Sequence, residues 1–582
     1  MRTSWLLSKF SFLIILYGVV HIEAFHQTHS STFNLNQTYK PSFHFQPSKN
    51  WMNDPNGPMR YKGLYHIFYQ HNPKGAIWSN NSIVWGHSVS KDLVNWFSLQ
   101  HALTPTKPYD INGCWSGSVT FLSNNRPNIL YTGIDKNNHQ TQNLAIPKNA
   151  SDPFLREWIK SPKNPIMLPN IVNKINATSF RDPTTAWIGH HDGLWRVLVG
   201  SQQKDNRGIT LLFKSKDFIN WIQAKYPFYS AKKIGMLECP DFFPVLINGT
   251  FGLDTSIKYD HDSIRYVLKV SLIDVSHDYY LIGTYDTIKD VYIPKNGFEQ
   301  NNNELTLVIR YDYGKFYASK TFYDDAKKRR VLWGWINESS IREDDVQKGW
   351  SGIQAIPRTL WLDKLGKQLI QWPIVEIEKL RINPPVKLHS KVLKRGTLLE
   401  ISGVTAAQAD VEISFEVNDL EKAQALNPSW KMDPQHLCTE NGSKVKETGL
   451  GPFGLLVLAS KNMQEYTSIF FKVFRANKKH VVLMCSDQSR SSLNHKNDLT
   501  TYGAFVDVNP IYDELSIRTL IDHSVVESFG GQGKTCIASR VYPTLAINDN
   551  AHLHVFNNGT VDVKIEKLSA WSMKKAKINE IH

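Results

Sequence analysis

Three short acidic segments in the first half of the chain carry residue types that suit acid–base chemistry. They are WMNDPNGP with Asp54, SFRDPT with Arg181 and Asp182, and MLECPDFF with Glu238 and Asp241. In each segment an acid stands near a proline at what reads as a strand start, where the missing N–H of proline is tolerated. A single Asp-Pro is most often only a turn, but three such segments flanked by Trp, Arg or Phe favour a functional site.

Two opposed carboxyl groups are the minimum that the hydrolysis of a glycosidic bond requires. One ionised carboxylate attacks the sugar, and one protonated acid, whose pKa is raised, protonates the leaving oxygen. A third acid can bind sugar hydroxyl groups. The three segments therefore predict a glycosidase, provided that the fold brings them into one pocket.

Three other polar clusters are interpreted as structural. DHS (522–524) holds the residue types of a catalytic triad, but adjacent residues on a strand point to opposite faces of the sheet. HHDG (190–193) and YDHDS (259–263) suggest metal ligands, yet both lie between strand-like runs, and Asp-Gly favours a hairpin turn. We therefore predict turns at these places, with no metal site and no cofactor.

The elements that must position the acids are predicted to be strands. Short alternating apolar runs are separated by Gly, Asn, Asp and Pro, which is typical of a β-sandwich, barrel or propeller. One element recurs 125 residues apart, as SKDLVNW (90–96) and SKDFINW (215–221). Repeated four-stranded units predict a propeller, in which strand starts cluster round the central channel.

The pattern changes near residue 366 and divides the chain into two domains. We predict a propeller catalytic domain over residues 44–365 and a linker over 366–389 that contains a Pro pair. Longer alternating strands follow, and they predict an antiparallel β-sandwich over residues 390–582. The fold class is thus all-β.

The N-terminus predicts export from the cell. Arg2 and Lys9 precede an apolar run over 10–20 and the small residue Ala24, so residues 1–24 read as a signal peptide. No later run is long enough to span a membrane. Eight Asn-x-Ser/Thr sequons predict a glycoprotein with these acceptors at its surface: Asn36, Asn80, Asn149, Asn176, Asn248, Asn337, Asn441 and Asn558.

Cysteine usage and charge indicate further properties. The five cysteines leave at least one free thiol, and Cys438 and Cys485, which lie in one later region, are expected to form a disulfide. The formal charge is +14, yet no nucleic-acid-binding motif is present. This charge favours a polyanionic matrix as a partner, and equally it can serve solubility alone. We expect a monomer.

The acidic segments also resemble those of plant acid invertases and fructan exohydrolases, which form glycoside hydrolase family 32. WMNDPNGP, FRDPT and ECPDFF, in this order, carry the resemblance together with FYQHNP (68–73), GCWSGS (113–118) and WGWINES (333–339). The resemblance covers nearly all of the mature chain and implies a five-bladed β-propeller followed by a β-sandwich. ECP resembles the cell-wall branch of the family and implies a secreted, extracellular enzyme of the cell wall.

The resemblance implies a role for each matching residue. Asp54 corresponds to the nucleophile, Glu238 to the general acid/base, and Asp182 to the transition-state stabiliser that holds fructosyl hydroxyl groups. The residues implied to line the fructose subsite or its aromatic rim are Trp51, Asn53, Gln70, Trp78, Trp115, Ser116 and Arg181. The implied reaction retains configuration, and it hydrolyses terminal non-reducing β-D-fructofuranosyl units. The resemblance also implies the disulfide between Cys438 and Cys485.

One segment, SLIDVSHDYY (271–280), departs from the family pattern and bears on the substrate. Family invertases usually carry an Asp-Asp-x-Lys/Arg-like run before His-Asp-Tyr-Tyr, and here Ile273 takes the first acidic place and Ser276 the basic one. In the family this acid–base pair helps to hold the glucose of sucrose. Asp274 remains as a candidate substrate-binding residue. A second departure is Leu237, where the family often has Trp, and we expect it to reshape the rim of the site.

We therefore predict a fructan exohydrolase acting on levan- or inulin-type chains, with a cell-wall invertase acting on sucrose as the alternative. A sugar-binding or regulatory protein without catalysis is a rival from another class, but such a protein should lack one of the three acids. Fructosyl transfer in place of hydrolysis is a third possibility, which oligomer growth at high sucrose would reveal.

Overall fold

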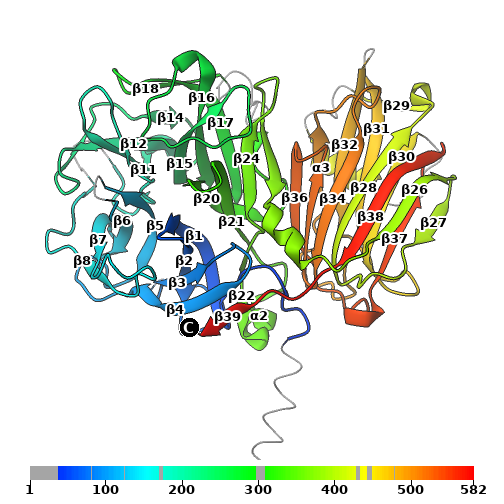
Figure 1. Cartoon of the computed structure of the whole chain (residues 1–582), viewed down its shortest axis with the longest axis horizontal. Helices are drawn as coiled ribbons and strands as arrows, with labels where there is room; N and C mark the ends of the chain where they lie inside the picture. The colour runs from blue at the N-terminus through cyan, green and yellow to red at the C-terminus, as the bar shows by residue number, and fades with distance from the viewer. Residues whose placement is uncertain are drawn as a thin grey trace, which may run out of the picture.

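Two all-β domains lie side by side in the computed structural model of the chain (Figure 1). It describes residues 37–79, 81–122, 125–169, 175–295, 309–427, 433–441, 449–476 and 479–581. The predicted signal peptide and the sequons at Asn36 and Asn80 lie outside these residues. No helix in the described part of the chain is long and apolar enough to cross a membrane.

Within the described residues, the first domain contains five sheets that form the blades of a propeller. The strands of the first two blades are β1 (Asn50–Tyr61), β2 (Leu64–Asn72), β3 (Val84–Ser90) and β4 (Trp96–Leu103), then β5 (Cys114–Phe121), β6 (Pro127–Ile134), β7 (Gln140–Pro147) and β8 (Trp158–Lys160). The third blade contains β9 (Phe180–Arg181), β10 (Trp187–Ile188), β11 (Trp195–Gln203), β12 (Arg207–Ser215), β13 (Trp221–Gln223) and β14 (Tyr229–Ala231).

The fourth and fifth blades complete the ring. Their strands are β15 (Leu237–Leu246), β16 (Ile264–Leu272), β17 (His277–Asp286), β18 (Val291–Pro294) and β19 (Ile309–Arg310), then β20 (Phe316–Asp324), β21 (Arg329–Ile336), β23 (Ile353–Gln354), β24 (Arg358–Leu362) and β25 (Leu369–Pro373). The short helix α2 (Arg342–Lys348) precedes β22 (Trp350–Ser351), which pairs with β1 in parallel and so joins the fifth blade to the first.

The sequence repeat marks equivalent turns of two blades. SKDLVNW connects β3 to β4 and SKDFINW connects β12 to β13. In both turns the serine hydroxyl accepts the N–H of the apolar residue three positions later, and that residue, Leu93 or Phe218, has a φ near +65° (63° and 65°). The two copies lie in the first and third blades, so the interval of 125 residues corresponds to two blades. The equivalent turn of the second blade has a different sequence.

The last strand of the fifth blade lies inside the segment that the sequence led us to expect as a linker. β25 (Leu369–Pro373) pairs with β24 along its whole length, so the propeller extends past residue 365. The 3₁₀-helix η5 (Val375–Leu380) then leads to the second domain. β25 reads LIQWP and has no clear alternation of apolar and polar residues, so the sequence pattern did not reveal it.

The second domain is a sandwich of two antiparallel sheets. One sheet contains β26 (Val386–Leu393), β38 (Val563–Ser572), β28 (Gln408–Val417), β34 (Leu515–Asp522), β35 (Val525–Gly530) and β36 (Thr535–Arg540). The other contains β27 (Thr397–Glu400), β37 (His552–Asn557), β30 (Leu450–Ala459), β31 (Thr467–Ala476), β32 (Lys479–Asp487), β33 (Tyr502–Val506) and the short β29 (Gln424–Ala425). The inner faces bury one apolar cluster between them.

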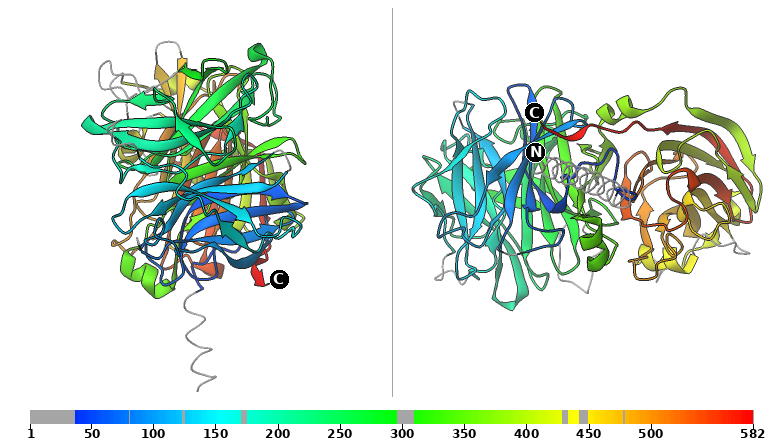
Figure 2. Two further views of the ribbon diagram at one scale, coloured as in Figure 1. Left: turned by 90° about the vertical axis from the view of Figure 1, so that its left-hand side faces the viewer. Right: turned by 90° about the horizontal axis from the view of Figure 1, so that it is seen from below.

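The chain ends in the propeller, not in the sandwich. After β38 the last residues cross back, and β39 (Ile578–Ile581) pairs in parallel with β4 at the edge of the first blade. Figure 2 shows this red segment running from the sandwich to the blue first blade. The range 390–582 expected for the sandwich thus includes a strand that belongs to the first domain.

Buried charged groups join the two domains. His44, before the first blade, contacts Asp522 at 2.9 Å and Glu527 at 3.0 Å, and all three side chains are fully buried. Arg358 of β24 pairs with the same Glu527 at 2.7 Å. Asp522 also accepts the backbone N–H groups of residues 42–44, so the DHS segment serves the domain interface, in line with its structural interpretation.

Cys438, in the helix α3 (Pro434–Asn441), and Cys485 form the expected disulfide, with a Cα–Cα distance of 5.6 Å. The other three cysteines are free and buried: Cys114, Cys239 and Cys536. The sequons at Asn149, Asn176 and Asn248 are exposed, whereas Asn337 and Asn558 are half-buried, and Asn441 is the last residue of α3.

Candidate active site

One inner strand of each blade brings a polar residue to the propeller axis. Asp54 lies on β1, Ser116 on β5, Arg181 on β9, Glu238 on β15 and Tyr317 on β20. Among them, β1 contacts β5 and β20, β5 contacts β9, and β15 contacts β20. Residues separated by more than 260 positions in the sequence therefore meet in one site.

Backbone irregularities coincide with the candidate residues. The ladder slips between Met52 and Pro55 in β1, and between Glu238 and Asp241 in β15. Similar shifts occur after Trp115 in β5 and after Tyr317 in β20. A bulge changes the direction of the side chain beside it. Each irregularity therefore lets a candidate side chain point in a direction that regular strand alternation would not allow.

Three non-glycine residues with positive φ directly follow candidate residues in the sequence. Asp182, Cys239 and Ala318 have φ values of 66°, 43° and 52°. Such backbone strain is concentrated at functional sites, where the surrounding structure holds it in place. Residue 57 must be glycine for two reasons. Its φ is 42°, and an added Cβ would lie only 2.6 Å from Val119 Cγ2.

Asp54 is held from both sides by hydrogen bonds. The Ser116 hydroxyl donates to Oδ2 at 2.6 Å, and the Asn53 amide donates to Oδ1 at 2.9 Å. Burial raises the pKa of Asp54 to about 6, with Asp182 and Glu238 adding to the rise and the two hydrogen bonds opposing it. The two hydrogen bonds orient the carboxylate, and the group becomes ionised above about pH 6. The ionised, oriented form is the one that can act as a nucleophile.

Asp182 faces the same space from the third blade. Its Oδ2 accepts the backbone N–H of Cys239 at 2.9 Å and lies 3.9 Å from Nε of Arg181. Burial raises the pKa of Asp182, and Arg181 opposes that rise. The Cys239 thiol lies 3.6 Å from Asp54 Oδ2 and 3.5 Å from Asp182 Oδ2, so one S–H bridges the two carboxyl groups.

Glu238 completes the set of three acids. Arg181 Nε donates to its Oε1 at 2.9 Å, and Arg181 Nη2 contacts the same oxygen. The Tyr317 hydroxyl donates to Oε2 at 2.5 Å. Glu238 precedes Cys239, which touches both aspartates, and the charges of Asp182 and Glu238 both act on Asp54, so the three carboxyl groups lie close together.

Four indole rings form a row beside Asp54. Trp51 lies between Trp78 and Trp335, with ring centroids 6.3 Å and 5.6 Å away, and Trp78 lies 5.6 Å from Trp115. Trp78 lies between Trp51 and Trp115 in this row and is 38% exposed. The predicted aromatic rim is thus joined by Trp335, which the sequence interpretation did not single out.

Asn53 and Gln70, two of the predicted subsite residues, make different kinds of contact. Asn53 accepts the Trp51 indole N–H at 2.8 Å while it supports Asp54, so it links rim and carboxylate. Gln70 is almost fully buried, and its amide, oriented to satisfy its neighbours, contacts Asn56 and Trp85. Gln70 thus binds Asn56, two residues after Asp54 in β1, rather than a carboxyl group of the site.

The SLIDVSHDYY segment forms the hairpin between β16 and β17 and stands beside Glu238. Leu272 pairs with Leu237, which places the turn over residues 273–276 at the start of β15. Ile273 is 48% exposed there, and Asp274 is exposed and lies against Gly235. The turn therefore borders the site, as the substrate hypothesis requires.

Leu237 does not reshape the rim, so the expectation for this residue is wrong. Its side chain is fully buried and packs in the apolar cluster of the third and fourth blades with Leu198 and Leu212. The alternation of β15 explains this result, because Leu237 points away from the face on which Glu238 lies.

Sequence reasoning missed the groups that support the acids. Lys269 donates to the carbonyls of Cys239 at 3.1 Å and Ser319 at 2.7 Å, and it pairs with Asp278 at 3.2 Å. Asp278 in turn accepts the Ser319 N–H. These buried contacts tie the bulges of β15 and β20 together. Tyr317 lies on the second bulge, and nothing in its spacing marks it.

Tyr317→Phe should lower kcat about tenfold to a hundredfold, because a hydrogen bond to a charged group is worth about 1.5–3 kcal/mol. We expect KM to change little, because Tyr317 contacts Glu238 and its loss acts on the chemical step. Steady-state kinetics from about pH 4 to 8 measure this, with Tyr512→Phe, at an 84% exposed site, as the control. An increase in KM at constant kcat would instead assign Tyr317 to substrate binding.

In the described residues, no group of three or more His, Cys, Asp or Glu side chains is arranged to hold a metal ion. Three neighbouring carboxyl groups with indole rings beside them, on a propeller followed by a sandwich, define a glycoside hydrolase. The chain belongs to glycosyl hydrolase family 32. Residues 44–373 match the family model "Glycosyl hydrolases family 32 N-terminal domain", and residues 376–572 match "Glycosyl hydrolases family 32 C terminal".

Relatives with two kinds of name are similar to the chain. "Beta-fructofuranosidase, insoluble isoenzyme CWINV3" of Arabidopsis thaliana is 60% identical over 94% of this chain and 92% of its own length. "Fructan 6-exohydrolase" of Beta vulgaris is 54% identical over 99% and 96%. The crystal structure of fructan 1-exohydrolase IIa from Cichorium intybus superposes with a TM-score of 0.89 at 52% identity, covering 93% of this chain and 99% of that one.

Proposed function

We propose that the enzyme is a secreted β-fructofuranosidase that hydrolyses terminal non-reducing β-D-fructofuranosyl units and prefers fructan chains. The family, the relatives and the cluster of three acids support the activity. The single observation that carries the preference is the exposed Ile273 at the hairpin beside Glu238. An apolar side chain offers no hydrogen bond to a glucose hydroxyl group at that place.

The reaction follows from the contacts of the two opposed acids. Asp54, oriented by Ser116 and Asn53, attacks C2 of the fructosyl unit and forms a covalent bond to it. The proton of Glu238 passes to the glycosidic oxygen as the bond from C2 to that oxygen breaks. A water molecule then attacks C2, Glu238 takes its proton, and Asp54 leaves as a carboxylate.

The remaining residues have binding and positioning roles in this proposal. Asp182 accepts hydrogen bonds from fructosyl hydroxyl groups, and Arg181 holds Glu238 in place. Trp51, Trp78 and Trp115 present indole faces on which a sugar ring can stack. Asp274 stands at the exit of the pocket, where the unit that leaves, or the next unit of a chain, would lie.

The preference is tested by comparing kcat/KM for sucrose, levan-type and inulin-type oligomers. We expect at least a tenfold higher value for one fructan type than for sucrose. Ile273→Asp with Ser276→Lys should raise kcat/KM for sucrose and leave that for fructans nearly unchanged, and Val275→Thr, also in the exposed turn, is the control. Fast cleavage of sucrose beside idle fructans would favour the cell-wall invertase. No release of fructose from any substrate would favour a silent sugar-binding protein.

We also propose that the enzyme resides in the cell wall as a monomer. The basic net charge of +14 and the cell-wall names of the relatives support this location. Attraction to a polyanionic matrix weakens with ionic strength, because the Debye length falls from about 10 Å at 0.1 M to about 3 Å at 1 M salt. Most of the activity should therefore leave isolated walls between these salt concentrations, and retention at 1 M salt would point to another mode of attachment.

A further inference from the structure

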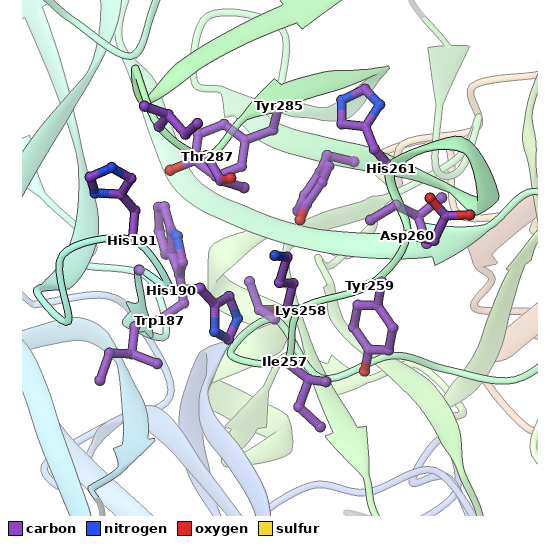
Figure 3. Close-up of a pocket in the computed structure, with 16 residues that line it drawn as sticks. Trp187, His190, His191, Ile257, Lys258, Tyr259, Asp260, His261, Tyr285 and Thr287 are labelled. Carbon is purple, nitrogen blue, oxygen red and sulfur yellow. The ribbon is translucent and has the colours of Figure 1, made fainter.

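Two polar segments that the activity does not use meet at one cavity. HHDG, at the end of β10, and YDHDS, before β16, are distant in sequence but line opposite walls of a cavity of about 390 Å³. We call this the far-face cavity and define it by Trp187, His190, Lys258, Asp260, Tyr266 and Tyr285. Figure 3 shows residues 187–191 on one side of it and residues 257–261 on the other.

The cavity lies at the opposite end of the blades from the active site. Ile264, which lines the cavity, pairs with Leu246 at the end of β15, whereas Leu272 pairs with Leu237 beside Glu238. The ten residues of β15 separate these ends by roughly 30 Å at about 3.3 Å per residue. A ligand in the far-face cavity therefore cannot reach the three acids.

The floor of the cavity is aromatic and rigid. Trp187, Tyr266 and Tyr285 all pack on Phe242, with ring centroids 5.1, 5.2 and 5.3 Å away. The Tyr285 hydroxyl donates to Asp290 at 2.5 Å, and that carboxylate also pairs with Arg196. Rings held in this way form a surface that does not have to be ordered when a ligand binds.

The walls offer donors and acceptors without partners. Within the described residues, the Lys258 amino group, the His190 ring and the Tyr266 hydroxyl make no side-chain hydrogen bond or ion pair. Asp260 adds a carboxylate at the same opening. Positive and negative groups are thus balanced over an aromatic floor, and polar groups converge on a cavity of the size that small ligands occupy.

We propose that the far-face cavity is a second saccharide site, which binds a neutral sugar ring or disaccharide without cleaving it. A sugar ring presents C–H groups on its face and hydroxyl groups around its edge, and this matches an aromatic floor bordered by Lys258, Asp260 and Tyr266. The carboxylate of Asp260 disfavours an anionic ligand, and the polar border disfavours an apolar one. The described residues contain no metal-binding group of side chains here that would offer another occupant.

The test uses the full chain carrying Asp54→Asn, so that no probe is hydrolysed. Saturation-transfer NMR is recorded with D-glucose, D-galactose and sucrose in turn, and dissociation constants in the millimolar range are expected. Tyr266→Phe, which removes one free hydroxyl, should weaken binding about fivefold or more for at least one sugar. His190→Trp, which fills the opening, should abolish that binding. Tyr512→Phe in the sandwich is the matched control.

The outcomes separate this site from the active site. In a chain with native Asp54, His190→Trp should keep full β-fructosidase activity, which also shows that the variant folds. Sugar binding that persists unchanged in both Tyr266→Phe and His190→Trp belongs to the active site and would overturn the proposal, as would the absence of binding by all three sugars. A parent enzyme that binds sugars at the cavity but releases no fructose would refute the proposed function alone.

Discussion

Asp54→Asn is expected to reduce kcat by about 10⁴-fold or more, because the amide cannot attack C2 and no covalent intermediate forms. The amide oxygen still accepts a hydrogen bond from Ser116 or Asn53, so the pocket keeps its shape. Fructose release from sucrose and from fructan oligomers measures the loss. Activity within tenfold of the parent would remove Asp54 from the role of nucleophile.

The same variant should be more stable than the parent at neutral pH. Asp54 has a pKa of about 6 in the folded protein against 3.8 when unfolded, so its ionisation in the folded state costs about 3 kcal/mol at pH 8 (about 1.36 kcal/mol per unit). The protonated form of Asp54 does not destabilise the folded protein, so the free energy of unfolding keeps its full value below pH 3.8. It falls as the pH rises through 6. The gain of Asp54→Asn therefore reaches up to about 3 kcal/mol at pH 8 and vanishes below about pH 4.

Chemical denaturation at several pH values measures this difference. Asp274→Asn, at an exposed position, is the control and should stay within about 0.5 kcal/mol of the parent at every pH. An equal gain for Asp54→Asn at pH 4 and pH 8 would show that the stabilisation comes from packing and not from the buried charge.

Glu238→Gln is the second variant with a large expected effect, a loss of about 10²- to 10⁴-fold in kcat. The amide keeps an oxygen for the Arg181 donors but has no proton to give to the leaving oxygen. The acid limb of the pH profile, which follows Asp54, should move below pH 6, because Glu238 no longer adds to the raised pKa of Asp54.

Two measurements separate a chemical loss from a structural one. A fructoside with a good leaving group needs no acid assistance in the first step, so an initial burst of leaving group should return. Azide, which attacks without a general base, should then raise turnover and yield a fructosyl azide. A variant as active as its parent on sucrose or fructan would contradict the acid/base assignment.

The positions of the three acids followed from local chemistry in the sequence. Asp54 and Asp182 precede prolines and Glu238 comes two residues before one, and the repeated turn after β3 and β12 indicated how such strand starts meet in a ring. The two-domain division was visible because the strands of the sandwich are longer and alternate more regularly. Local patterns therefore marked the acids as candidates, whereas the role expected of each acid came from the resemblance to the family.

The rest depended on contacts between strands that no local pattern encodes. Tyr317 reaches Glu238 only because β20 bulges after it, and the Cys239 thiol reaches two carboxyl groups only because its φ is 43°. Leu237 was misjudged for the related reason that strand alternation next to a bulge decides which side faces the pocket. The boundary near residue 366 was wrong by one strand, since β25 is recognisable mainly by its pairing with β24.

The C-terminal strand β39 has a consequence for the order of synthesis. The first blade carries Asp54 and leaves the ribosome early, yet β39, the partner of its outer strand β4, is made more than 470 residues later. Until then the edge of β4 stays open to pairing with other chains, which is a recognised route to aggregation. A variant without β39 would keep every residue of the candidate site but would lose this closure, so the blade that carries Asp54 depends on a strand that follows the sandwich in the sequence.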